Sequence, residues 1–334
     1  MPFIVTCDPG LEDIAEKEIK EKDRKAKVER LLNFQGKLLV HSKANLFDLH
    51  SAHHIIKLIR TFSLKEANLE ELKREVEKAE IEGIEAATTF RVTSQRFGNH
   101  LFTSVDMQRV AGEVIAKKYG KKVDLKNFDM NVRVDLIGSF GYVGIQLTRE
   151  SLYKRYKKKF NHPAAIKSTI AYGMLRLADI SKDETLLDPM CGSGTIPIEA
   201  ASLYGGKVKI IAGDKSLKCV EGSMENAKMN FLDKFIDFRQ LDALKLKEHV
   251  SQVDKIVTNP PYGVRIARKA DLKTFYRKFL ESASDVLQHR MTIITLKADM
   301  FRSLVLFTRK YKIVHERVVE AGGIYPHIFV LEKI

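Results

Sequence analysis

The pattern of apolar and polar positions in the first 60 residues predicts a small α+β unit. The segments Phe3–Cys7 and Lys37–His41 have the length and composition of short strands. Apolar residues recur every three or four positions over residues 11–19 and again over Leu46–Leu58, which predicts two amphipathic helices. Asp8-Pro9 offers the first of these helices an N-cap and a first-turn proline.

The next part of the chain continues the α+β pattern. It contains a charged surface helix over residues 69–82 and a second helix over Asp106–Tyr119. Three strands are expected around these helices, with antiparallel pairing, at Thr89–Thr93, Asn131–Leu136 and Tyr142–Leu147.

From Thr185 onward, strands and helices alternate strictly, which predicts a doubly wound, mostly parallel Rossmann-like α/β sheet. The last two strands, separated by Gly322-Gly323, are expected to form an antiparallel hairpin at the sheet edge. Helices are expected to begin near Ile196, Leu217, Leu272 and Met300. The predicted strands are Leu186–Asp188, Val208–Asp214, Ile236–Leu241, Lys255–Thr258, Met291–Leu296, Lys312–Val319 and His327–Leu331.

Composition narrows the class of protein. The 334 residues are 44% apolar, which excludes a wholly disordered chain, and they contain no apolar run long enough to span a membrane. The N-terminus has no secretory signal pattern, and three widely spaced cysteines without a CxxC favour a reducing, cytoplasmic location and no metal site. The net charge of +14 suits a polyanionic partner, although Lys/Glu-rich enzymes are also often basic.

Part of this charge lies in one run, Arg149–Phe160, which has six cations against one glutamate and three interleaved aromatic residues. We interpret the run as a domain boundary that contacts RNA phosphates. The alternative is a solvated edge strand guarded by lysines. The candidate contacts are Lys154, Arg155, Lys157, Lys158 and Lys159, with Arg91, Arg96, Arg265 and Arg268 as weaker candidates elsewhere.

A glycine loop follows the first strand of the α/β region, in the string LLDPMCGSGTIP. Pro197 occupies the third glycine position of a dinucleotide-binding GxGxxG, and the loop lacks the Lys-Ser/Thr of a P-loop. Asp188, just before the loop, would repel a pyrophosphate but attract an ammonium group. This favours a ligand with an amino-acid moiety, such as S-adenosylmethionine (SAM), over the alternative of an ordinary βα turn.

Two more acidic residues end the next strands. Asp214 lies 20 residues after Gly194, where a carboxylate can accept hydrogen bonds from ribose hydroxyls. Asp242 ends the third strand and can accept from an adenine amine. Each alone is more often a helix N-cap, but together they predict a ligand crevice at the carboxyl ends of the strands.

The string Asn259-Pro260-Pro261-Tyr262 follows the fourth strand and is the most specific motif in the chain. The prolines fix the backbone and remove two donors. The Asn259 side-chain oxygen and the Pro260 carbonyl can then accept both N–H groups of an exocyclic amine, while Tyr262 stacks on its base. This arrangement predicts methylation of a base amine by alignment and electrostatics, on a base taken out of any helix. The alternative is a merely rigid turn.

The glycine loop, the acidic strand ends and the NPPYG string resemble class I SAM-dependent methyltransferases that act on amino groups. Residues 91–115 and 123–155 resemble a THUMP domain, PGLEDIAEKEI resembles the ferredoxin-like domain that precedes it, and HPAAIKSTIAYGMLRLA resembles the start of THUMP methyltransferases. The whole chain thus resembles the tRNA guanine-N2 methyltransferases of the TrmN type and their archaeal relatives. The implied domains are 1–60 ferredoxin-like, 61–150 THUMP, 151–165 basic linker and 166–334 methyltransferase.

This resemblance implies a SAM-dependent enzyme that binds tRNA, forms N2-methylguanosine at position 6 of the acceptor stem, and has neither a membrane segment nor an obligatory protein partner. Asn259, Pro260 and Tyr262 would hold the guanine. The implied SAM-binding residues are Asp188, Pro189, Cys191, Gly192, Gly194, Thr195, Asp214, Lys215, Asp242, Ala243 and Asn259.

Other functions stay open at this stage. Guanine-10 tRNA enzymes share the architecture and often have Asp where Asn259 stands, and ribosomal guanine-N2 enzymes also combine THUMP with NPPY. An adenine-N6 methyltransferase would use the same two acceptors. A non-catalytic RNA-binding protein is disfavoured by the intact loop and NPPY motif, and an NAD oxidoreductase by Pro197.

Overall fold

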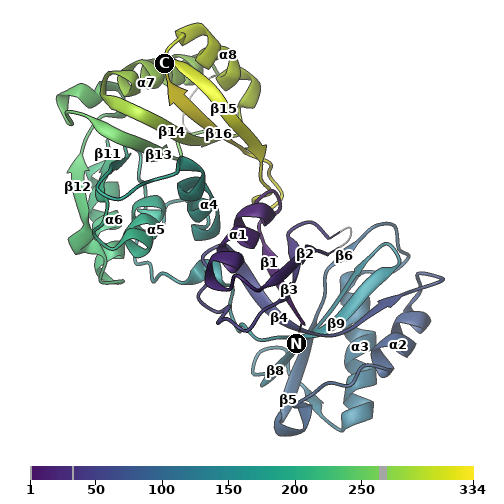
Figure 1. The fold of residues 1–334 in the computed structure, drawn as a ribbon. Coiled ribbons are helices and arrows are strands. Elements are labelled where there is room, and N and C mark those ends of the chain that lie inside the picture. The colour runs from purple at the N-terminus through teal and green to yellow at the C-terminus, as the bar shows by residue number, and fades with distance from the viewer. Residues whose placement is uncertain (1, 32–33, 263–268) are drawn as a thin grey trace. The chain divides into compact units, whose positions relative to one another are not determined.

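The computed structural model describes residues 2–31, 34–262 and 269–334 (Figure 1). The chain forms two units. The first contains residues up to Cys7 and Ala15–Leu152, and the second contains Asp8–Ile14 and Tyr153–Ile334. The THUMP boundary predicted at residue 60 lies inside a strand of the first unit.

The first unit is built on a nine-stranded sheet with the strand order β2-β3-β1-β4-β9-β8-β5-β7, and β6 pairs with β8. β8 and β9 pair antiparallel as expected, but β5 pairs parallel with β8, so the antiparallel pairing expected for Thr89–Thr93 is wrong. Helices α2 and α3 pack through buried side chains such as Leu72, Met107 and Ile115 onto Phe90 and Val132 of the sheet. The elements are β1 (Pro2–Cys7), β2 (Lys27–Arg30), β3 (Lys37–His41), β4 (Ala52–Ser63), α2 (Leu69–Glu77), a 3-10 turn (Ile84–Ala86), β5 (Thr89–Thr93), β6 (Arg96–Phe97), α3 (Ser104–Tyr119), β7 (Lys122–Val123), β8 (Met130–Ile137) and β9 (Phe140–Gln146), while α1 (Glu12–Lys22) starts in the second unit.

The helix predicted over Leu46–Leu58 is wrong. Residues from Ala52 onward form β4, which pairs antiparallel with both β1 and β9. The segment contains the adjacent β-branched residues Ile55 and Ile56, and both are buried in the sheet. Burial against two neighbouring strands outweighs a helical spacing of apolar residues.

The second unit has a seven-stranded sheet with the order β12-β11-β10-β13-β14-β16-β15. The first five strands in this order are parallel, whereas β16 pairs antiparallel with both β14 and β15. All seven predicted strands and the hairpin are therefore confirmed. The elements are a 3-10 turn (Leu152–Lys154), α4 (Ser168–Ala178), β10 (Thr185–Asp188), α5 (Thr195–Tyr204), β11 (Lys209–Asp214), α6 (Leu217–Lys228), a 3-10 turn (Asp233–Phe235), β12 (Ile236–Gln240), a 3-10 segment (Ala243–Glu248), β13 (Val253–Thr258), α7 (Lys269–Val286), β14 (Leu287–Thr295), α8 (Ala298–Thr308), β15 (Tyr311–Val318) and β16 (His327–Lys333).

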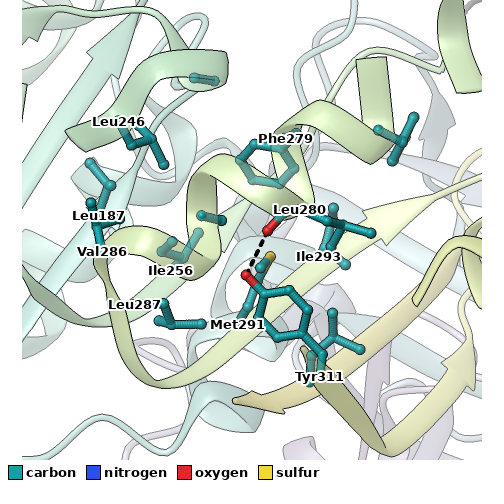
Figure 2. Close-up of a cluster of buried hydrophobic side chains, with 14 of the residues drawn as sticks. Leu187, Leu246, Ile256, Phe279, Leu280, Val286, Leu287, Met291, Ile293 and Tyr311 are labelled. Atoms are coloured by element: carbon teal, nitrogen blue, oxygen red, sulfur yellow. Dashed lines mark hydrogen bonds between the residues drawn. The ribbon is translucent and has the colours of Figure 1, made fainter. Parts of the chain in front are cut away.

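Successive residues of a strand point to opposite faces of the sheet. Apolar strand residues are therefore buried beneath helices on both faces. Leu186 of β10 belongs to the core beneath α4 and α5. The next residue, Leu187, belongs to the core beneath α7 and α8 (Figure 2). In that second core the Tyr311 hydroxyl donates to the Leu280 carbonyl over 2.9 Å, so the buried phenol is satisfied. The Rossmann-like fold class is thus confirmed.

The segment Asp8–Ile14 is part of the second unit through specific polar contacts. Asp8 is buried and accepts hydrogen bonds from Lys167, over 2.8 Å, and from the Thr169 hydroxyl. Gly10 has a φ of +94°, and a Cβ there would lie 2.1 Å from the Val318 carbonyl oxygen, so only glycine fits.

None of the helices in residues 2–31, 34–262 and 269–334 combines the length and the apolar character of a membrane-spanning segment.

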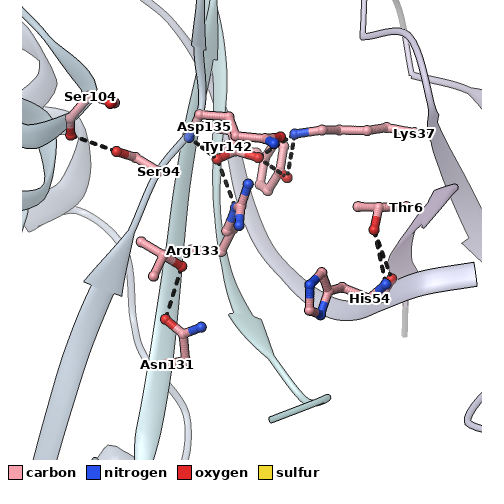
Figure 3. A network of polar contacts seen from close by, with 11 residues as sticks. Thr6, Lys37, His54, Ser94, Ser104, Asn131, Arg133, Asp135 and Tyr142 are labelled. Atoms are coloured by element: carbon pink, nitrogen blue, oxygen red, sulfur yellow. Dashed lines mark hydrogen bonds and ion pairs between the residues drawn. The ribbon is translucent and has the colours of Figure 1, made fainter. Parts of the chain in front are cut away.

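A buried ion pair joins β3 to β8 in the first unit (Figure 3). The Lys37 ammonium contacts Asp135, which also accepts from the Tyr142 hydroxyl over 2.5 Å and from Arg133 over 2.8 Å. Burial opposes ionisation of Asp135, but Lys37 and Arg133 outweigh it and keep the pKa of this carboxyl below its usual value. The carboxylate therefore stays charged inside the sheet.

Removal of one partner should destabilise this unit. Lys37→Met leaves Asp135 buried without its ammonium partner and should cost about 3–5 kcal/mol, whereas Lys37→Met/Asp135→Leu should recover only part of that loss, because Arg133 and the Tyr142 hydroxyl then lose their buried acceptor. Native-state hydrogen exchange of the β8 amides measures both free energies of opening. Unchanged protection in Lys37→Met would contradict the assigned role of the pair.

Candidate active site

The turn between β10 and α5 requires its glycines for two different reasons. Gly192 and Gly194 both have positive φ, at +54° and +81°. A Cβ on Gly194 would lie 2.9 Å from the Ser223 side chain of α6, so this glycine permits close packing between the loop and a helix. A Cβ on Gly192 would instead face the ring of His162 at 3.6 Å.

A cavity of about 590 Å³ opens beside this loop, at the carboxyl ends of the parallel strands. Ten of the eleven residues predicted to bind SAM line it, and Gly194 is the exception. Pro260 also lines it, together with residues that the sequence analysis did not select. These are His162, Ala164, Ala165, Ile166, Met190, Ser193, Ile196, Ser216, Cys219, Pro261 and Phe275.

Asp188 is the buried acid of the cavity. Its Oδ1 accepts from the Thr258 hydroxyl over 2.8 Å and from the Met190 amide over 3.2 Å. Burial raises the pKa of Asp188 to about 7, and the nearby charge of Asp214 also raises it, whereas these two hydrogen bonds lower it. A cationic group in the cavity would favour the ionised form.

The other two acids are held by the backbone. Asp214 accepts from the amides of Gly192, over 3.0 Å, and Ser216, over 2.9 Å, so it ties the glycine loop to the end of β11. Asp242 accepts from the Leu244 amide and pairs with Lys215, each over 3.0 Å. The N-cap alternative is therefore realised for Asp242, which also lines the cavity.

Asn259 follows β13, and both ends of its side chain are hydrogen-bonded. Its Nδ2 donates to the Ala164 carbonyl over 2.9 Å, and its Oδ1 accepts from the Tyr262 hydroxyl over 2.6 Å. Tyr262 lines a second cavity of about 570 Å³, which shares His162, Ala164, Ala165, Ile166 and Pro261 with the first. Burial raises the pKa of Tyr262, so its hydroxyl stays protonated and donates.

Residues 153–160 of the basic run belong to the second unit, and the run forms no edge strand. The Arg155 guanidinium binds both carboxylate oxygens of buried Glu199, at 3.0 and 3.1 Å. Lys158 donates to the Thr195 hydroxyl over 3.1 Å, and burial lowers its pKa despite the nearby charge of Glu199. These two cations therefore bind the protein itself. Lys154, Lys157 and Lys159 are exposed, and Lys159 pairs with the exposed Glu225 over 3.3 Å.

The remaining predicted RNA contacts lie apart from this run in the chain. The Arg91 guanidinium lies 3.9 Å from the ring centre of Phe128, and Arg149 lies over the same ring at 5.4 Å. The buried Nε of Arg91 has no hydrogen-bond partner in the described structure. Arg96 donates to the Gly98 carbonyl over 2.8 Å. Arg265 and Arg268 lie outside the described residues.

Residues of the cavity that sequence reasoning missed come mainly from segments without a local chemical signal. Phe275 lies on α7 and reaches the cavity only through the fold. The segment His162–Ile166 lies in the string that resembles the start of THUMP methyltransferases, but that resemblance predicts no binding role for His162. The sequence signal that could have selected His162 is its position shortly before α4.

Comparisons with known proteins agree with this geometry. Residues 155–327 match the RMKL-like methyltransferase domain family, and residues 66–146 match the THUMP domain. The tRNA (guanine(6)-N2)-methyltransferase of Methanocaldococcus jannaschii is 33% identical, covering 99% of this chain and all of that protein. The enzyme of the same name from Thermus thermophilus is 35% identical over 98% of both.

Among solved structures, TrmN from Thermus thermophilus superposes with a TM-score of 0.87 at 33% identity, over all of this chain and 99% of that one. Identity, coverage and fold therefore agree over both units. The chain belongs to the family of THUMP-domain, SAM-dependent RNA guanine-N2 methyltransferases of the TrmN type, with SAM as its cofactor.

Proposed function

We propose that the protein methylates N2 of guanine 6 in the acceptor stem of tRNA. The observation that carries this proposal is the orientation of Asn259, which lines the first cavity and whose Oδ1 faces Tyr262, a residue that lines the second cavity. Relatives that match over the full chain are named for this reaction. A guanine-10 or ribosomal guanine as the substrate is the alternative within the same chemistry.

The first cavity fits the proposed cofactor in size and in donor chemistry. Pockets for such ligands are typically about 300–1,000 Å³. Asp188 would hold the ammonium group, Asp214 the ribose hydroxyls and Asp242 the adenine amine, and all three line the cavity. When bound, SAM supplies a methyl group activated by its sulfonium charge.

The acceptor amine would bind where the Tyr262 hydroxyl now donates. Asn259 Oδ1 would accept one N–H of the guanine amine, and the Pro260 carbonyl would accept the other. Tyr262 would then release Asn259 and pack against the base in the second cavity, whose lining includes Ile294 and Leu296. Two fixed acceptors align the nitrogen lone pair, and such alignment provides a large part of the rate enhancement.

The exposed lysines of the basic run and the Arg91–Phe128 pair are proposed RNA contacts. Lys154, Lys157 and Lys159 can reach phosphates, since their side chains are exposed to solvent. Burial lowers the pKa of Arg91, and the positive charges of Arg149 and Arg133 lower it further. An RNA phosphate would relieve the repulsion among these three cations.

Asn259→Ala tests the acceptor. The variant should form N2-methylguanosine about 10²–10³ times more slowly, because one fixed polar contact to the reacting group is lost. Binding of S-adenosylhomocysteine should stay within a few-fold of the wild type, as measured by calorimetry. Loss of cofactor binding together with turnover would mean that Asn259 acts on the cofactor and not on the base.

Cofactor affinity should depend on pH through Asp188. Its pKa is raised to about 7, so the carboxyl is protonated below that pH and must lose a proton to pair with an ammonium group. The dissociation constant of S-adenosylhomocysteine should therefore rise by up to about tenfold per pH unit below 7. Asp188→Asn should bind weakly with a flatter profile, and an equal slope in both proteins would refute the assignment.

The lysine contacts can be tested by salt dependence. Substituting Lys154, Lys157 and Lys159 by Gln should weaken tRNA binding and reduce the slope of log K against log salt by about 2, since each phosphate contact contributes roughly 0.7–0.9. The matched control replaces Lys182, Lys209 and Lys312 by Gln. These lysines are exposed near the amino ends of the strands, at the edge of the sheet opposite the cofactor cavity. Equal effects of the two triple variants would assign the run to general surface charge.

A further inference from the structure

The segment His162–Ile166 lies between the cofactor cavity and the second cavity that contains Tyr262. Four of its residues, His162, Ala164, Ala165 and Ile166, line both the cofactor cavity and the second cavity that contains Tyr262. The conformation of this dividing segment therefore affects both the methyl-donor site and the base site. His162 begins the segment and makes the contacts that shape it.

His162 closes a tight turn with its own side chain and backbone. Its ring Nδ1 accepts from the Ala164 amide over 3.3 Å, and its carbonyl accepts from the Ala165 amide over 3.0 Å. A side-chain acceptor that binds the amide two residues later is the geometry of an Asx turn. Since Nδ1 is the acceptor, the neutral ring carries its proton on Nε2.

This turn sets the position of the Ala164 carbonyl, which accepts from Nδ2 of Asn259 over 2.9 Å. A primary amide has a donor end and an acceptor end that can exchange by rotation. With Nδ2 held at Ala164, Oδ1 must face Tyr262. If the carbonyl moved, the amide could rotate and present a donor to the guanine amine, which is itself a donor.

The cofactor loop supports the other side of the His162 ring. The ring faces Gly192, where a Cβ would lie 3.6 Å from the imidazole, an ordinary van der Waals distance. The amide of Gly192 is in turn bound to Asp214 over 3.0 Å. His162 is thus packed between the glycine loop and the turn at Ala164.

We propose that His162 is a positioning residue for Asn259, acting through the Ala164 backbone to keep the acceptor oxygen facing the base. It needs no contact with the reacting atoms. The inference rests on the proposed function, because it takes Asn259 as the acceptor for the guanine amine.

Two substitutions separate this role from simple packing. His162→Asn retains an acceptor for the Ala164 amide in an Asx turn, whereas His162→Ala does not. With tRNA bound to excess enzyme at saturating SAM, cofactor affinity does not enter the single-turnover rate. His162→Ala should lower this rate by about tenfold, the effect of one hydrogen bond, and His162→Asn should restore most of it.

A double-variant cycle decides whether the effect passes through Asn259. In the Asn259→Ala background, His162→Ala should cause no further loss of rate. Equal losses in His162→Ala and His162→Asn, or a loss that adds fully to that of Asn259→Ala, would overturn the proposal. If Asn259→Ala itself leaves the rate unchanged, the proposed acceptor fails; if only His162→Ala leaves it unchanged, the failure is confined to this inference.

Discussion

Parallel pairing brings the carboxyl ends of β10, β11, β12 and β13 to one edge of the sheet in the second unit. Asp188, Asp214, Asp242 and Asn259 lie at or just after these ends, so residues up to 71 positions apart in the chain line one cavity. The same pairing buries Asp188 deeply enough to raise its pKa to about 7. A ligand ammonium group would offset the cost of ionising that carboxyl.

The second requirement is a defined orientation for a side chain that can face two ways. Asn259 has a donor and an acceptor on one planar group, and the structure binds each to a different neighbour. The neighbours come from the dividing segment and from the NPPY string itself. Under the proposed function, selectivity for an amine acceptor would depend on a backbone carbonyl as well as on the motif.

Sequence reasoning recovered the parts of this structure that depend on periodic patterns and local turn chemistry. All seven strands of the second unit follow from strand–helix alternation, and Asp188, Asp214 and Asp242 follow from the acidic residues at strand ends. The remaining predicted residues that line the cavity follow from the family resemblance. It failed over Leu46–Leu58, where pairing with two distant strands decides the conformation of β4. It also missed Glu199, which binds Arg155 from 44 positions away, because such contacts depend on tertiary packing.

The central claim is that a guanine N2 amine of tRNA is the methyl acceptor. The most direct test incubates the purified protein with SAM labelled in its methyl group and a single unmodified tRNA that has guanine at position 6, then maps the labelled nucleoside. The account predicts N2-methylguanosine at position 6 and none when that base is replaced by adenine. Label on an atom other than a guanine N2, or no labelled nucleoside in that tRNA, would contradict the claim, whereas label on N2 of another guanine would contradict only the assignment to position 6.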